Sequence, residues 1–107
     1  MPHIIVEYTG DIKDEMLGAL HSNLAAQDTI NLAAIKTRAL KVERAIIGDG
    51  AHAHFVHITV KLLSGRPETL RQKIGADLQA IALEHINAET TALSIEVAEM
   101  DPATYVK

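Results

Sequence analysis

The sequence predicts an α+β (α/β) domain built from two βαβ units, in which a four-stranded sheet carries two helices on one face. A strand pattern, a helix pattern and a second strand pattern occur in this order twice, over about 2–47 and about 53–107. A βαβ crossover is right-handed, so the two strands of each unit are parallel and the helices share one face. With 107 residues, the chain is expected to form a single domain, 1–107.

The first unit opens with alternating apolar residues at 3–8, which is typical of a strand. Asp11 is expected to cap the following helix through its side-chain oxygen. Apolar residues at helical spacing continue this helix to about Gln27. A second strand is predicted over about 33–43, and the glycines in 48–50 mark a loop.

The second unit repeats the pattern. A strand is predicted over 55–62, and the Ser-Gly-Arg-Pro sequence at 64–67 ends it. Pro67 suits the first turn of a helix, which its apolar spacing extends to about Ile86. A last strand is predicted over 93–100.

Nothing in the chain is left to cover the second face of this sheet. Apolar residues nevertheless occur at both parities of the predicted strands, which indicates burial on both faces. We therefore expect the chain to associate with further copies of itself.

Composition excludes several classes of function. The chain has no cysteine, which rules out thiolate catalysis and disulfides and suits a reducing cytoplasm, where we expect the protein. It shows neither a signal-peptide pattern nor a transmembrane pattern. Its net charge of −4 and the lack of a basic stripe argue against a nucleic-acid surface. A few cations focused in one cleft remain compatible with an acidic ligand.

Pro2 follows Met1 directly and precedes the first predicted strand. Methionine is usually trimmed when the second residue is small, so the mature chain is expected to begin at Pro2. Its secondary amine would then be a strong potential base held rigidly by its own ring. The plain alternative is that position 2 merely tolerates proline.

These features together resemble the tautomerase superfamily and, within it, the 5-carboxymethyl-2-hydroxymuconate delta-isomerase family. The residues that carry the resemblance span nearly the whole chain and lie at 1–7, 31–38, 49–50, 55–61 and 65–66. The resemblance implies a homotrimer that isomerises an unsaturated hydroxy or keto acid and needs no cofactor. From the residues themselves, we expect no metal, no nucleic acid and no membrane partner.

The resemblance also assigns roles to individual residues. Pro2 is expected to be the general base and Arg66 a second catalytic residue. Lys36 and Arg38 are expected to bind substrate carboxylates, because they lie two apart and so share one strand face. Phe55 is expected to line the pocket. Lys36 departs from the family pattern, which has arginine there, so the charge stays but the bidentate fork is lost.

Plainer interpretations of these residues stay open. Lys36 and Arg38 also fit a solvated strand face, Arg66 a cap on the turn at 64–67, and Phe55 the core. Only the first unit has the proline and only the second has the Gly-Arg pair, which predicts one site per chain.

The histidines at 52, 54 and 57 invite a metal interpretation. On a strand, however, His57 points away from His52 and His54, so no metal site is predicted there. Two other functions remain: another proline-based tautomerase or a dehalogenase, and a non-catalytic trimeric binding protein with a vestigial pocket.

Overall fold

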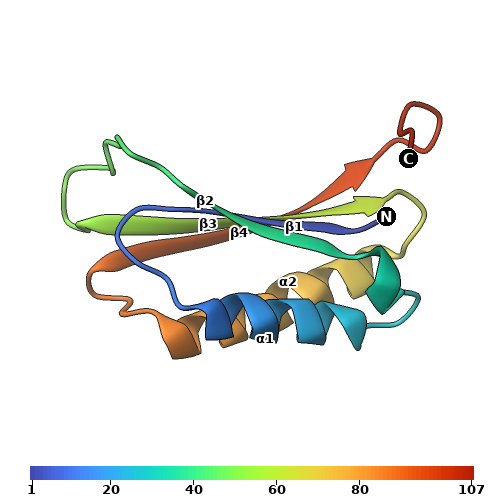
Figure 1. The fold of residues 1–107 in the computed structure, drawn as a ribbon, viewed down its shortest axis with the longest axis horizontal. Helices are drawn as coiled ribbons and strands as arrows, with labels where there is room; N and C mark the ends of the chain where they lie inside the picture. Colours follow the sequence, from blue (N-terminus) through green and yellow to red (C-terminus); the bar gives the residue numbers. More distant parts are fainter.

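The computed structural model describes residues 1–107 and places a four-stranded sheet over two helices (Figure 1). The elements, in chain order, are β1 (His3–Tyr8), α1 (Asp14–Ala25), the 3₁₀ turn η1 (Leu32–Ala34), β2 (Lys36–Lys41), β3 (His54–Leu63), α2 (Glu68–His85) and β4 (Thr91–Met100). The strand order is β2-β1-β3-β4. Each βαβ unit pairs its own strands in parallel, and β1 joins β3 antiparallel. The predicted fold class is confirmed.

The start of α1 differs from the prediction. The helix begins at Asp14, its N-cap position is Lys13, and no side chain caps it. The backbone stays extended at Lys13 after the left-handed turn at Gly10, so Asp11 lies ahead of the helix. The Asp11 carboxylate lies instead 3.8 Å from Lys41 Nζ, in an exposed ion pair.

The second strand is also shorter than predicted. The side chain of Asn31 accepts a hydrogen bond from the backbone N–H of Ala33, which starts the turn η1. This short-range bond competes with strand geometry. The strand therefore begins at Lys36 rather than near residue 33.

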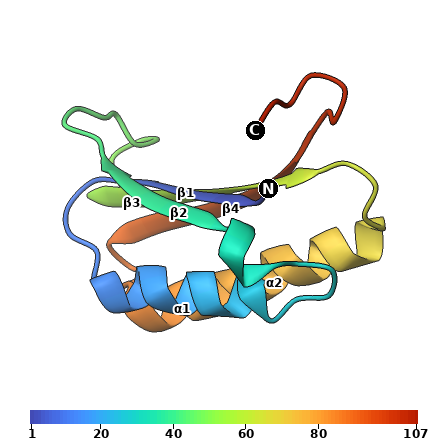
Figure 2. The ribbon, with the colours of Figure 1, turned by 45° about the vertical axis from the view of Figure 1, so that its right-hand side comes forward.

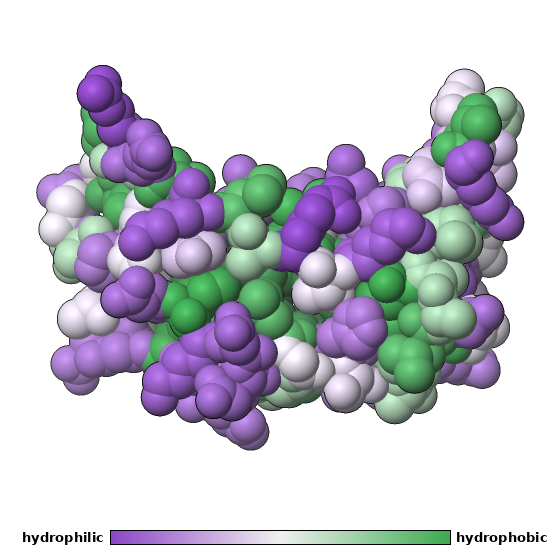
Figure 3. Space-filling view, viewed as in Figure 1, coloured by the Kyte–Doolittle hydropathy of each residue, from purple (hydrophilic) through white to green (hydrophobic).

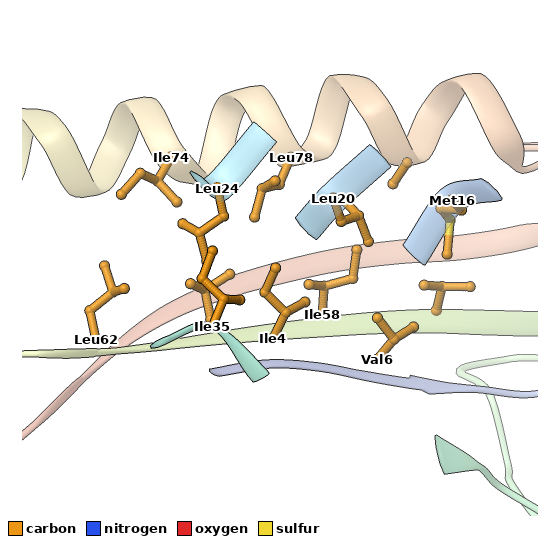
Figure 4. Close-up of a cluster of buried hydrophobic side chains, with 13 residues drawn as sticks. Ile4, Val6, Met16, Leu20, Leu24, Ile35, Ile58, Leu62, Ile74 and Leu78 are labelled. Carbon is orange, nitrogen blue, oxygen red and sulfur yellow. The ribbon is translucent and has the colours of Figure 1, made fainter. Parts of the chain in front are cut away.

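The core lies between the sheet and the two helices (Figure 4). In α1, Met16, Leu20 and Leu24 recur every four residues on one face and are fully buried. In β3, alternate side chains from Val56 to Leu62 point into the same layer, as period-2 geometry requires. The remaining buried apolar residues are Ile4, Val6, Ile35, Ile74, Leu78 and Ala82. The aliphatic side chains fill the single layer between sheet and helices.

The opposite face of the sheet, which we call the open face, has no helix over it (Figures 1 and 2). The β2–β3 loop and the C-terminal segment rise from its two ends (Figure 3). The open face is more polar than the sequence pattern indicated. By register, it carries His3, Ile5, Glu7, Lys36, Arg38, Leu40, Phe55, His57, Thr59, Lys61 and their neighbours on β4. Neither helix is long and apolar enough to cross a membrane.

Candidate active site

Pro2 lies at the head of β1, a central strand of the sheet. Its side chain is buried, and its carbonyl oxygen accepts a hydrogen bond from the backbone N–H of Lys36 at 3.0 Å. His3 is then paired on both sides, with Lys36 in β2 and Lys61 in β3. The start of the chain is thereby held in the sheet, as expected from the sequence.

Positive charges surround the terminal amine. Burial lowers the pKa of the Met1 amine below its usual range, and the charges of Lys107, Arg66 and Lys36 lower it further, in that order. Desolvation and neighbouring cations both disfavour the ammonium form of an amine. Two of the predicted site residues, Arg66 and Lys36, thus act on this end of the chain, and Lys107 joins them.

Arg66 also has a structural role. Its Nε donates to Thr29 Oγ1 at 3.0 Å, its Nη2 to the Thr29 carbonyl at 3.2 Å, and its Nη1 to the Leu63 carbonyl at 3.3 Å. A guanidinium carries five N–H donors, so two remain for another acceptor. The turn-capping interpretation of Arg66 therefore holds, and it leaves donors available for a ligand.

Lys36 and Arg38 lie on the open face of β2, opposite His3 and Ile5 of β1. Both side chains are exposed, and neither forms an ion pair within the chain. Arg38 Nη1 instead donates to His3 Nδ1 at 3.0 Å. The two cations thus share one strand face, as predicted, with charges that no carboxylate neutralises.

Phe55 does not lie with the other predicted site residues. It stands at the beginning of β3, where its N–H donates to Thr9 Oγ1 at 3.2 Å, past the far end of β1 from Pro2. The antiparallel register of β1 and β3 is the reason, because it pairs His3 with Lys61 at the site end. Phe55 therefore lies far from the Pro2 of its own chain, and its place in the pocket of Pro2 stays a prediction that would need a second copy of the chain.

The histidines have separate partners. His54 Nδ1 lies 3.3 Å from Thr9 Oγ1, and His57 Nδ1 lies 2.6 Å from Ser94 Oγ. No group of three histidine, cysteine, aspartate or glutamate side chains is arranged to hold a metal ion.

Three residues near the site could not be predicted from the sequence. Lys107 and Thr29 carry no local motif, because their roles depend on contacts across the fold. Tyr105 had a weak signal, since it is one of only three aromatic residues and lies beyond the last strand. Its hydroxyl lies 2.9 Å from His3 Nε2, which brings the C-terminal segment back over the sheet.

Comparison with known proteins shows the family of this chain. A family model described as 5-carboxymethyl-2-hydroxymuconate isomerase matches residues 2–107. A curated 5-carboxymethyl-2-hydroxymuconate Delta-isomerase from Escherichia coli is 32% identical over 117 residues, covering 100% of this chain and 93% of the relative. The chain belongs to the 5-carboxymethyl-2-hydroxymuconate isomerase family.

Solved structures agree with this family assignment. A 5-carboxymethyl-2-hydroxymuconate isomerase from Deinococcus radiodurans has a TM-score of 0.86 at 28% identity, over 99% of this chain and 87% of that one. A structure described as a fused 4-OT wild-type symmetric trimer has a TM-score of 0.72 at 18% identity, over 98% of this chain and 93% of that one, and shows the fold alone. The isomerase class and the tautomerase fold predicted from the sequence are confirmed.

Proposed function

We propose that the protein moves a proton within 5-carboxymethyl-2-hydroxymuconate or a similar unsaturated hydroxy or keto acid, with the amine of Pro2 as general base. The observation that carries this proposal is the buried Pro2 at the head of β1, directly beside the Met1 amine, whose pKa is lowered by burial and by the charges of Lys107, Arg66 and Lys36. A base with a pKa near the working pH contributes about 10²–10⁴ in rate.

The reaction needs no redox partner. The amine takes a proton from one position of the conjugated system and returns it to another, so that only a double bond moves. Negative charge builds up on the substrate between these steps, and Arg66 has two N–H donors left to stabilise it. Lys36 and Arg38 pair with the substrate carboxylates, for which they have no competing ion pair in the chain.

We propose further that the active form is a homotrimer. A solved structure that shares the fold of this chain is described as a fused 4-OT wild-type symmetric trimer. The open face of the sheet is uncovered, and Leu40 on it is 51% exposed. In an assembly, Phe55 can approach the Pro2 of a second copy although it lies far from its own.

The proposal is tested first by intact mass and an ultraviolet assay. Intact mass reports whether Met1 has been removed, and the assay follows loss of the conjugated substrate across a panel of 2-hydroxymuconates. The Pro2→Ala variant is the matched comparison, because alanine is also small enough for Met1 to be trimmed and leaves a primary amine. We expect kcat to fall, but by less than the factor of about 10²–10⁴ that a general base contributes, because the primary amine of alanine remains as a weaker substitute. Full activity in Pro2→Ala would rule out the proline as base.

A second candidate function rests on Lys36. An ammonium lacks the planar fork that arginine offers to a carboxylate. If the side chain at position 36 selects the substrate carboxylate, the preferred substrate is a different 2-hydroxymuconate or the substrate of another proline-based enzyme. The substrate panel separates the two candidate functions. If 5-carboxymethyl-2-hydroxymuconate is not the preferred substrate of the parent enzyme, Lys36→Arg is expected to raise kcat/KM for it. If it is the preferred substrate, no rise is expected. A chain that retains Met1 and isomerises no substrate of the panel would point to a non-catalytic binding protein.

A further inference from the structure

A cavity of about 450 Å³ opens on the open face of the sheet, beside the start of β1. The C-terminal segment lies on the same side of the sheet, away from both helices (Figures 1 and 2). The cavity is lined by His3, Arg38, Lys61, Met100, Asp101, Thr104 and Tyr105. It therefore joins all four strands and the C-terminal segment, and two of its residues, Arg38 and Lys61, are basic side chains without an ion pair.

His3 makes two hydrogen bonds in this cavity, and their geometry determines its protonation. Arg38 Nη1 lies 3.0 Å from His3 Nδ1, and Tyr105 Oη lies 2.9 Å from His3 Nε2. A guanidinium can only donate, so Nδ1 must offer its lone pair. The imidazole is therefore neutral, carries its proton on Nε2 and donates it to the Tyr105 oxygen. The Tyr105 proton is then free for another acceptor in the cavity.

The charges around His3 favour this neutral form. Burial is the largest cause of the lowered pKa of His3. The positive charges of Arg38, Lys36, the terminal amine and Lys61 lower it further, in that order. The remaining titratable groups that line the cavity come from the C-terminal segment and are Asp101 and Tyr105. Protonation of His3 removes the acceptor that Arg38 uses and sets two positive charges against each other.

We propose that His3 is a positioning residue, whose neutral imidazole holds the Arg38 guanidinium at the cavity so that Arg38 can pair with a carboxylate of the substrate. This inference rests on the proposed role of Arg38 in substrate binding. An exposed arginine has several rotamers, and the bond to Nδ1 removes part of that freedom before the substrate arrives. The contact to Tyr105 fixes the ring itself, because it holds the second nitrogen.

The kinetic test compares two substitutions at one position. His3→Phe removes the acceptor, so we expect KM for the acidic substrate to rise about tenfold, with a smaller change in kcat. A rise of about tenfold corresponds to the low end of the free energy of a hydrogen bond to a charged group. His3→Asn keeps an oxygen near the position of Nδ1 and is expected to restore KM to within about threefold. His57→Phe is the matched control, since His57 lies on the same face but bonds to Ser94 rather than to a cation.

The pH profile separates positioning from a merely structural role. In the parent enzyme, KM rises as the pH falls through the lowered pKa of His3, below the usual histidine value of about 6.5. This rise is absent from His3→Asn, which cannot be protonated. A KM for His3→Phe equal to that of the parent, or a His3→Asn variant as impaired as His3→Phe, overturns the proposal.

A second measurement does not depend on catalysis. The side-chain ¹⁵N spectrum of His3 at pH 7 is expected to show a neutral ring with the proton on Nε2, and Arg38→Ala is expected to raise the His3 pKa. A ring that is charged at pH 7, or that carries its proton on Nδ1, overturns the inference even in an active enzyme. If the expected spectrum is found but no hydroxymuconate is turned over, the proposed function fails and the His3–Arg38 contact stands.

Discussion

Replacing Arg66 by methionine and by lysine separates its two roles. Methionine keeps much of the length of the side chain but removes the charge, whereas lysine keeps the charge and loses the planar fork. The planar fork donates hydrogen bonds to Thr29 and Leu63. The charge contributes to the lowered pKa of the Met1 amine, although burial and Lys107 contribute more. Both variants are therefore expected to lose stability, and they are expected to differ in pH dependence.

The loss of stability follows from the contacts of the fork. Arg66 makes hydrogen bonds of 3.0, 3.2 and 3.3 Å to neutral oxygens at a partly exposed position. At about 0.5 kcal/mol each, a value set low because solvent screens bonds at a partly exposed position, their loss lowers the free energy of unfolding by about 1.5 kcal/mol in Arg66→Met. Lysine can recover one of these bonds, which leaves about 1 kcal/mol. Both values are measured by urea unfolding at a fixed protomer concentration, because assembly contributes to apparent stability.

The difference appears in kcat/KM against pH, which reports the pKa of the free enzyme's base. Arg66→Met removes a cation, so the amine pKa rises and the acidic limb of the profile moves to higher pH. Activity at pH 7 falls as a result, because less of the amine is in its free-base form. Arg66→Lys keeps the limb near its original pH. Identical limbs in the parent and both variants, together with the expected loss of stability, would reduce Arg66 to a turn cap.

Two further predictions concern stability away from the site. The nearly buried amide of Gln27 donates to Asp77, whose pKa is lowered mainly by Lys73 and then by Gln27. Gln27→Leu is expected to lower the free energy of unfolding by about 1 kcal/mol and to raise the Asp77 pKa. The variant then loses less stability than the parent as the pH falls through the Asp77 pKa. An unchanged Asp77 titration by NMR contradicts this. Gly10 has φ +73°, and a Cβ there would lie 3.0 Å from His54 Nδ1. Gly10→Ala should therefore lower the free energy of unfolding by about 1–2 kcal/mol in urea, and no loss would show that the turn relaxes freely.

Much of the fold could be predicted because local patterns and global topology agree. The alternation at 3–8 and the four-residue spacing of Met16, Leu20 and Leu24 each identify one element and the face that it buries. The misplaced ends lie at Asp11, whose carboxylate pairs with Lys41 instead of capping the helix, and at Asn31, whose side chain caps the turn η1 ahead of the strand. Local sequence does not choose between a cap and an ion pair to another strand.

The candidate site also combines features that are local in the sequence with features that depend on long-range contacts. The type and order of Pro2, Lys36, Arg38 and Arg66 are visible in the sequence, since a terminal proline, a pair two residues apart and a Gly-Arg turn are local features. The distance of Phe55 from Pro2 depends on the register between β1 and β3, which is a long-range property that the sequence does not show. The contact of Tyr105 with His3 spans 102 residues and has no local signal.

The sequence by itself determined the two βαβ units, the buried face of each helix and the chemical types available for a proton transfer. Only the tertiary structure decided which of these groups meet. The pairing of β1 with both β2 and β3 brings the terminal amine, Lys36 and Arg66 together and sends Phe55 to the other end of the sheet. The physical reason is that periodicity is a property of neighbouring residues, whereas charge, burial and hydrogen bonding at a site sum over residues that are distant in the chain.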